Sequence, residues 1–146
     1  STHPSGSLAT ALVSCQDIMA KGKDIPLVSA NKNMKFAIKE MSKKELGIVC
    51  VKEKNGKISV MTDGDLRRHS NNLYKKKITK VATKNPSWIS ENATALSAID
   101  KMTNLKISSL LVTKNKDINK KNKKVVGVIT MLQCLSRGIK WQRPKK

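Results

Sequence analysis

The chain contains one pattern of residues twice, and this duplication limits the folds that are open to it. Residues 31–51 recur 61 positions later as residues 92–112. Further along, Thr62 corresponds to Thr130 at an offset of 68, so the second copy carries a seven-residue insertion between two expected strands. A small unit that occurs twice usually cannot bury its apolar face alone. We therefore expect the two copies to pack together, with the cleft between them as the place for a ligand.

The composition sets the class of protein. A chain of 146 residues has room for a compact core, and with 3% aromatic residues this core is expected to be aliphatic. No apolar run is long enough to span a membrane, and no signal-peptide pattern is visible. The three cysteines lack metal-ligand spacing, and Cys50 lies in an apolar strand pattern that favours a buried thiol. These features are typical of a reducing compartment, and we expect a cytoplasmic protein without a metal.

The formal net charge of +20 has two interpretations. It could attract an anionic partner such as nucleic acid, a membrane surface or a phosphorylated ligand. It could also reflect solvated lysine-rich faces, because the lysines gather in expected loops at 75–77 and 114–124. Interleaved aromatic residues, which would stack on bases, are missing. The solvated interpretation is favoured, and nucleic-acid binding is kept as a weaker alternative.

Each copy shows the pattern of a strand, a helix, two further strands and a second helix. Apolar residues from Met34 to Met41 recur at helical spacing, with Asn31 as the expected N-cap. Asn92 holds the corresponding position in the second copy. The expected strands are 24–28, 47–51, 57–61, 87–89, 109–112 and 125–130.

The predicted fold class is therefore α/β (α+β), with two β-α-β-β-α repeats packed sheet to sheet about a pseudo-twofold axis. The expected boundaries are a linker at 1–15, a first repeat at 16–79, a second repeat at 80–140 and a basic tail at 141–146.

The run TDGDLRR, from Thr62 to Arg68, begins where a return strand meets a helix. The spacing of Thr62 and Asp65 is that of a capping box, which is the structural interpretation. Gly64 costs about 1 kcal/mol against alanine inside a helix and indicates a close approach to the backbone. A carboxylate can accept from two sugar hydroxyls, and arginines near a helix start suit a phosphate. The functional interpretation is therefore a ribose phosphate site.

The second copy has Gln133 in place of Asp65, so the first copy is expected to hold the ribose. His69 is left open between a phosphate contact and a solvated side chain. The candidate ligand-binding residues are Thr62, Asp63, Asp65, Arg67, Arg68, Ser109 and Thr130.

The doubled unit, with Asp17-Ile18-Met19 opening the first copy and Thr62-x-x-Asp65 closing it, resembles a tandem pair of CBS (cystathionine-β-synthase-type) domains. The TDGDLRR run is similar to the regulatory CBS pair at the C-terminal end of bacterial arabinose-5-phosphate isomerases. Residues 3–8, HPSGSL, resemble the last stretch of the sugar isomerase domain in that family.

The resemblance implies a regulatory module that is not catalytic by itself. Its parent enzymes interconvert ribulose 5-phosphate and arabinose 5-phosphate, which supplies the lipopolysaccharide sugar Kdo. The implied ligand is CMP-Kdo or an adenine nucleotide, with Thr62 and Asp65 as ribose contacts. The implied partners are the isomerase domain and a second CBS pair in a homodimer. His3 aligns with a family active-site position but has no catalytic partner in this chain.

A second hypothesis treats the pair as a dimerisation scaffold with a vestigial site. An enzyme acting alone is the least favoured class, because no nucleophile–base pair or metal cluster is visible in the sequence.

Overall fold

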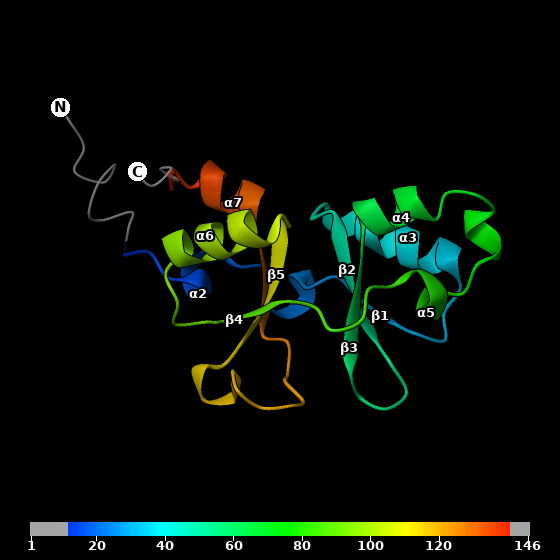
Figure 1. The fold of residues 1–146 in the computed structure, drawn as a ribbon, viewed down its shortest axis with the longest axis horizontal. Coiled ribbons are helices and arrows are strands. Elements are labelled where there is room, and N and C mark those ends of the chain that lie inside the picture. The colour runs from blue at the N-terminus through cyan, green and yellow to red at the C-terminus, as the bar shows by residue number, and fades with distance from the viewer. Residues whose placement is uncertain (1–11, 141–146) are drawn as a thin grey trace. The chain divides into compact units, whose positions relative to one another are not determined.

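The computed structural model describes residues 12–140, so His3, the HPSGSL run and the basic tail lie outside the described residues. The chain divides into two compact units. Unit I is formed by residues 22–86, and unit II by the described residues 12–21 and 87–140. Each unit is built around its own three-stranded sheet (Figure 1).

Unit I carries the first copy. Its sheet has the order β1-β2-β3, in which β1 runs parallel and β3 antiparallel to β2. Its elements are η2 (Gly22–Asp24), β1 (Leu27–Ser29), α3 (Met34–Lys44), β2 (Ile48–Lys52), β3 (Ile58–Thr62), α4 (Asp63–Arg68), η3 (Leu73–Lys75) and α5 (Ile78–Val81).

Unit II repeats this topology with the order β4-β5-β6. Its elements are α2 (Cys15–Ile18), β4 (Trp88–Ser90), α6 (Ala95–Leu105), β5 (Ser109–Thr113), η4 (Asn115–Asp117), β6 (Gly127–Thr130) and α7 (Met131–Ser136). The predicted strand, helix, strand, strand and helix of each copy are confirmed. The insertion forms the β5–β6 connection, where the Thr113 hydroxyl donates to the carbonyl of Lys124 at 2.7 Å.

The predicted N-caps Asn31 and Asn92 are wrong by two residues in both copies. The side chain of Asn33 accepts from the N–H of Phe36, and that of Thr94 accepts from the N–H of Ser97. These side chains, and not those of Asn31 and Asn92, satisfy the first free N–H groups of each helix. The error arose because the duplication aligns the two asparagines, although both precede the helix in a turn.

The cores are aliphatic, as the composition predicted. Met34, Ala37 and Met41 of α3 are buried in the core of unit I, where α3 packs on β1 and β2, while Ile38 is only partly buried. The corresponding stripe on α6 is fully buried. Cys50 is a buried free thiol, as predicted, and Cys15 and Cys134 are also buried and free. In the described part of the chain, no helix is long and apolar enough to cross a membrane.

The short segment ahead of each copy packs in the unit that the other copy forms. Ala20 exchanges two backbone hydrogen bonds with Val128 of β6, at 2.9 and 3.0 Å. Thr83 does the same with Val60 of β3, at 2.7 and 3.0 Å. The compact units therefore differ from the expected repeats 16–79 and 80–140, which describe the duplication and stay predictions.

The two segments meet their sheets with residues of different size. Met19, just before Ala20, packs on Gly127 at the start of β6. In unit I the bridge between Thr83 and Val60 places Ala82 and Ser59 at the corresponding positions. A large side chain thus faces a glycine in one unit, and a small side chain takes its place in the other. This difference in size favours the observed pairing, in which residues 19–20 lie on β6 and residues 82–83 lie on β3.

Substituting Gly127 with alanine is expected to destabilise the protein by about 1–3 kcal/mol, because the site is already full. The added Cβ would lie 2.7 Å from Cγ of Met19 and 2.9 Å from the carbonyl oxygen of Ala20. Urea denaturation measures the free energy of unfolding. The double variant Met19→Ala/Gly127→Ala should lose less than the sum of the single losses, because the two changes relieve each other.

The matched control is Ser59→Ala at the corresponding position of unit I. The Ser59 hydroxyl is buried without a hydrogen-bond partner, so its removal should cost little. Equal losses for Gly127→Ala and Ser59→Ala would contradict the proposed difference between the two segments.

Candidate functional site

Thr62 is the last residue of β3 and the N-cap of α4. Its Oγ1 accepts from the N–H of Asp65 at 3.3 Å, and Oδ2 of Asp65 accepts from the N–H of Thr62 at 2.9 Å. The predicted capping box is confirmed. It fixes the Asp65 side chain against the end of β3, which is why a carboxylate is held at this corner of unit I.

The Asp65 carboxylate is the centre of a polar cluster and is only 3% exposed. Its Oδ2 also accepts from the Thr62 hydroxyl at 3.2 Å. Its Oδ1 accepts from Nη2 of Arg68 at 2.7 Å and from the Thr83 hydroxyl at 2.8 Å. We call Thr62, Asp65, Arg68 and Thr83 the Asp65 cluster. Both carboxylate oxygens are engaged within unit I.

The pKa of the Asp65 carboxyl lies below its ordinary value of 3.8. Burial alone would raise this pKa, because it disfavours the charged form. The hydrogen bonds from the Thr62 N–H, the Thr83 hydroxyl, the Arg68 guanidinium and the Thr62 hydroxyl stabilise the charged form and outweigh burial. Asp65 is therefore an ionised acceptor at neutral pH.

Arg68 is the last residue of α4, and its guanidinium lies beside Gly64 in the first turn. A Cβ at Gly64 would stand 3.1 Å from its Nη1, so this glycine leaves room for the guanidinium. The close approach that Gly64 indicated is thus made by the chain's own Arg68. The arginine side chain remains 65% exposed despite its ion pair with Asp65.

The other candidate residues of unit I surround this cluster without joining it. Asp63 is exposed and lies beside Gly47, whose carbonyl accepts from the Asp63 N–H at 3.2 Å. Arg67 is exposed, and no ion pair of it is found among the described residues. His69 is half-buried, and its carbonyl accepts from Nζ of Lys76 at 3.2 Å.

Thr83 is the residue of the cluster that the sequence did not predict. It lies 18 residues after Asp65, in the segment that pairs with β3. In the structure Thr83 corresponds to Ala20 of the other segment. The sequence alone does not align these two residues, so it gave no reason to place Thr83 near Asp65.

In unit II, Ser109 and Thr130 lie opposite each other in the register of β5 and β6. Thr130 and Gln133 form a capping box in which Gln133 Oε1 accepts from the Thr130 N–H at 2.8 Å. Ser136 takes the place of Arg68 by the duplication. The corner of unit II therefore has neither the carboxylate nor the cation of the Asp65 cluster.

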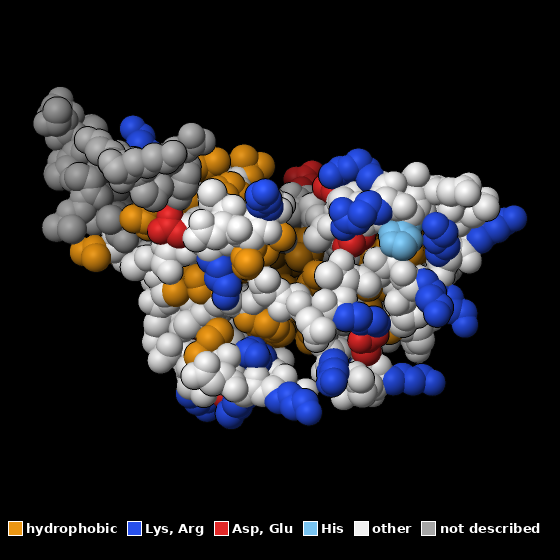
Figure 2. Space-filling view, in the orientation of Figure 1, with side chains coloured by type: hydrophobic (Ala, Val, Ile, Leu, Met, Phe, Trp, Pro, Cys, Tyr) orange, Lys and Arg blue, Asp and Glu red, His pale blue; other side chains and the backbone are white. Residues whose placement is uncertain are grey.

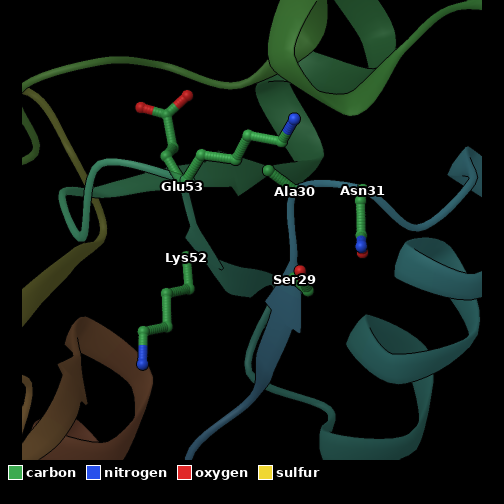
Figure 3. Close-up of a pocket in the computed structure, with 6 residues that line it drawn as sticks. Ser29, Ala30, Asn31, Lys52 and Glu53 are labelled. Carbon is green, nitrogen blue, oxygen red and sulfur yellow. The ribbon is translucent and has the colours of Figure 1, made fainter.

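A shallow hollow of about 190 Å³ lies at the other end of the sheet of unit I, where β1 and β2 end. Figure 3 shows the side chain of Glu53 pointing away from those of Lys52 and Asn31. Glu53 is paired with Lys84. Ligand sites need polar groups that converge on one point, which this hollow lacks. No group of three or more metal-ligating side chains occurs between residues 12 and 140.

The lowered pKa of Asp65 predicts a pH-dependent contribution to stability. Because the folded pKa is lowered, the contribution is complete above the unfolded pKa and disappears as pH falls through the folded pKa. Asp65→Asn should lower the free energy of unfolding by about 1–2 kcal/mol at neutral pH. Denaturation of both proteins as a function of pH should show this difference shrinking below about pH 4.

Asp63→Asn is the matched control, because it removes an exposed carboxylate from the same turn and changes the net charge equally. It should change stability much less. Equal effects of the two substitutions at every pH would show that Asp65 acts only through net charge.

Comparison with known proteins identifies the family. Residues 78–138 match the CBS domain family. The chain is 38% identical over 135 residues to the arabinose 5-phosphate isomerase KdsD of Francisella tularensis, covering 89% of this chain and 39% of that protein. It is 31% identical over 143 residues to KdsD of Yersinia pestis. The chain thus spans about two fifths of the length of these curated relatives.

Solved structures have the same fold. The CBS domain pair of protein MJ0100, in complex with 5′-methylthioadenosine and S-adenosyl-L-methionine, superposes with a TM-score of 0.69 at 23% identity, covering 86% of this chain and 94% of that chain. CBSX2 in complex with AMP gives a TM-score of 0.68 at 18% identity, covering 85% and 94%. The two sheets with their helices and the relatives together show that this chain is a pair of CBS domains, homologous to the C-terminal region of arabinose 5-phosphate isomerases.

Proposed function

We propose that the chain is a regulatory module that binds an adenine nucleotide through the Asp65 cluster of unit I. The observation that carries this proposal is a buried, ionised carboxylate at the end of β3, beside an exposed arginine. A carboxylate accepts hydrogen bonds from vicinal hydroxyls, and a guanidinium pairs with phosphate. The cluster therefore matches the two polar parts of a nucleotide.

The related structures support the choice of adenine. AMP, 5′-methylthioadenosine and S-adenosyl-L-methionine, which those CBS pairs hold, share an adenosine group with a ribose diol. CMP-Kdo also contains a ribose and a phosphate, and it follows from the pathway of the isomerase relatives alone. We place adenine nucleotides first and keep CMP-Kdo as the second ligand to test.

The relatives support a regulatory role. In them the CBS region accompanies a larger remainder of the protein, because this chain matches only about two fifths of their length. Binding regulates a partner domain only if the ligand has different affinity for two arrangements of the protein. In this proposal the nucleotide biases an arabinose 5-phosphate/ribulose 5-phosphate isomerase domain, and the CBS pair itself carries out no chemistry.

AMP, ATP or CMP-Kdo should raise the melting temperature of the chain, with a shift that grows with the logarithm of ligand concentration. The shift should be lost or strongly reduced in Asp65→Asn, because an amide keeps one acceptor oxygen but carries no charge. Differential scanning fluorimetry measures both. Asp63→Asn serves as the control and should keep the shift.

No shift with any of these ligands at millimolar concentration would exclude a nucleotide sensor. A shift that persists unchanged in Asp65→Asn would place the ligand elsewhere.

A second candidate function is a dimerisation platform, which an apolar surface of unit II favours. Leu132 and Leu135 lie three residues apart on α7 and are 72% and 49% exposed. Leu105 and Ile107, at the end of α6, are also exposed, and α7 begins beside them because the carbonyl of Ser108 accepts from the Met131 N–H. Figure 2 shows hydrophobic side chains gathered over α7. We call these four residues the α7 patch.

The fold itself does not require this patch. At the corresponding positions of unit I the duplication places Lys44, Leu46, Gly64 and Arg67, three of which are charged or lack a side chain. Figure 2 shows Lys and Arg side chains over α4. A second copy of the chain, presenting the same leucines across a twofold axis, would cover the patch.

Leu135→Glu should therefore weaken self-association by about tenfold or more, because two carboxylates would be placed in an apolar contact. Analytical ultracentrifugation over a range of concentrations measures the dimer. Arg67→Glu, at the corresponding position of α4, is the control and should leave association unchanged. A wild-type chain that stays monomeric at high concentration would exclude this function.

A further inference from the structure

The Asp65 carboxylate has no free acceptor position for a ligand in this structure. Four donors reach it: the N–H and hydroxyl of Thr62, Nη2 of Arg68 and the hydroxyl of Thr83. A carboxylate offers about four lone-pair positions. A ribose diol can bind this carboxylate only if it displaces donors that the chain itself supplies.

The two oxygens differ in how readily they can be released. Oδ2 is held by the backbone N–H and the side chain of Thr62, which belong to the capping box of α4. Releasing Oδ2 would open the first turn of the helix. Oδ1 is held by Arg68 and Thr83, and both of these residues are exposed. Water can reach these two donors once they are freed, so releasing Oδ1 costs less than releasing Oδ2, although the charge pair with Arg68 is still lost.

We infer that Arg68 is a displaceable internal partner of Asp65, which a ribose diol replaces and which then binds the phosphate of the same ligand. This inference rests on the proposed function and names the ligand class more narrowly. The ligand must carry a vicinal diol and a phosphate, since only the phosphate compensates the guanidinium for the loss of Asp65. A nucleoside without phosphate has to break the ion pair without compensation.

Gly64 supports this role. It leaves the guanidinium room along the first turn, with Nη1 3.1 Å from the position of a Cβ. Arg68 is joined to the rest of the cluster only at its terminal Nη2, so rotation of its side chain disturbs no backbone contact. Arg67, its neighbour, is exposed and shows no ion pair within residues 12–140. The two adjacent arginines therefore form a matched pair for an experiment.

The experiment measures the affinity of the 146-residue chain for AMP and for adenosine by titration calorimetry, in wild type, Arg68→Ala and Arg67→Ala. Wild type should bind AMP more tightly than adenosine. In Arg68→Ala, AMP should weaken about tenfold, because one charge-assisted contact is lost, and adenosine should bind several-fold more tightly, because its competitor is gone. Arg67→Ala should leave the ratio of the two affinities within about twofold of wild type.

The opposite signs separate this role from a structural one, since a loosened cluster would weaken both ligands together. Arg68→Lys provides a second variant, in which the charge remains without the planar fork; it should keep part of the preference for AMP. Equal changes for AMP and adenosine in Arg68→Ala would overturn the inference while leaving the proposed function intact. Absence of binding in wild type would overturn both.

Discussion

The exchange of short segments between the two copies is the constraint on which the rest of the structure depends. Unit I is formed by one continuous segment, residues 22–86. Unit II is formed by two segments, 12–21 and 87–140, which are separated in the chain by unit I. The backbone pairs Ala20–Val128 and Thr83–Val60 fix these segments at equivalent strand edges. Unit II therefore completes its core with Cys15, Ile18 and Met19, which precede the first copy in the chain.

The same exchange makes the two candidate corners chemically different. In unit I the segment brings the Thr83 hydroxyl to the Asp65 carboxylate, so the strand edge and the start of α4 are joined by one polar cluster. In unit II the corresponding residue is Ala20, which has no hydroxyl to donate. The apolar contact of Met19 with Gly127 holds that segment instead. Unit I thus holds its segment with a polar side-chain contact, and unit II holds its segment by packing.

Features set by local spacing were predictable from the sequence, and those set by distant residues were not. The helical stripes and the Thr62–Asp65 capping box depend on residues within one or two turns, and both were predicted. The choice of Asn33 over Asn31 depends on how the chain leaves β1, where the Ala30 N–H donates to the carbonyl of Lys52. The contact of Thr83 with Asp65 depends on the segment exchange. The helix and strand periodicities of the sequence do not indicate this exchange.

The difference between Asp65 and Gln133 gives the two corners different hydrogen-bonding groups. Each residue gives one oxygen to its capping box, Oδ2 in Asp65 and Oε1 in Gln133. The carboxylate then retains a second acceptor, Oδ1, which can receive a hydroxyl pair. The amide retains only its NH₂ group, which donates and cannot accept from a diol. Unit II therefore forms the same capping box as unit I, but it lacks the second acceptor oxygen on which the proposed ribose contact rests. Under the proposed function, the exchange of a carboxylate for an amide is therefore one reason why unit I and not unit II would hold the ligand.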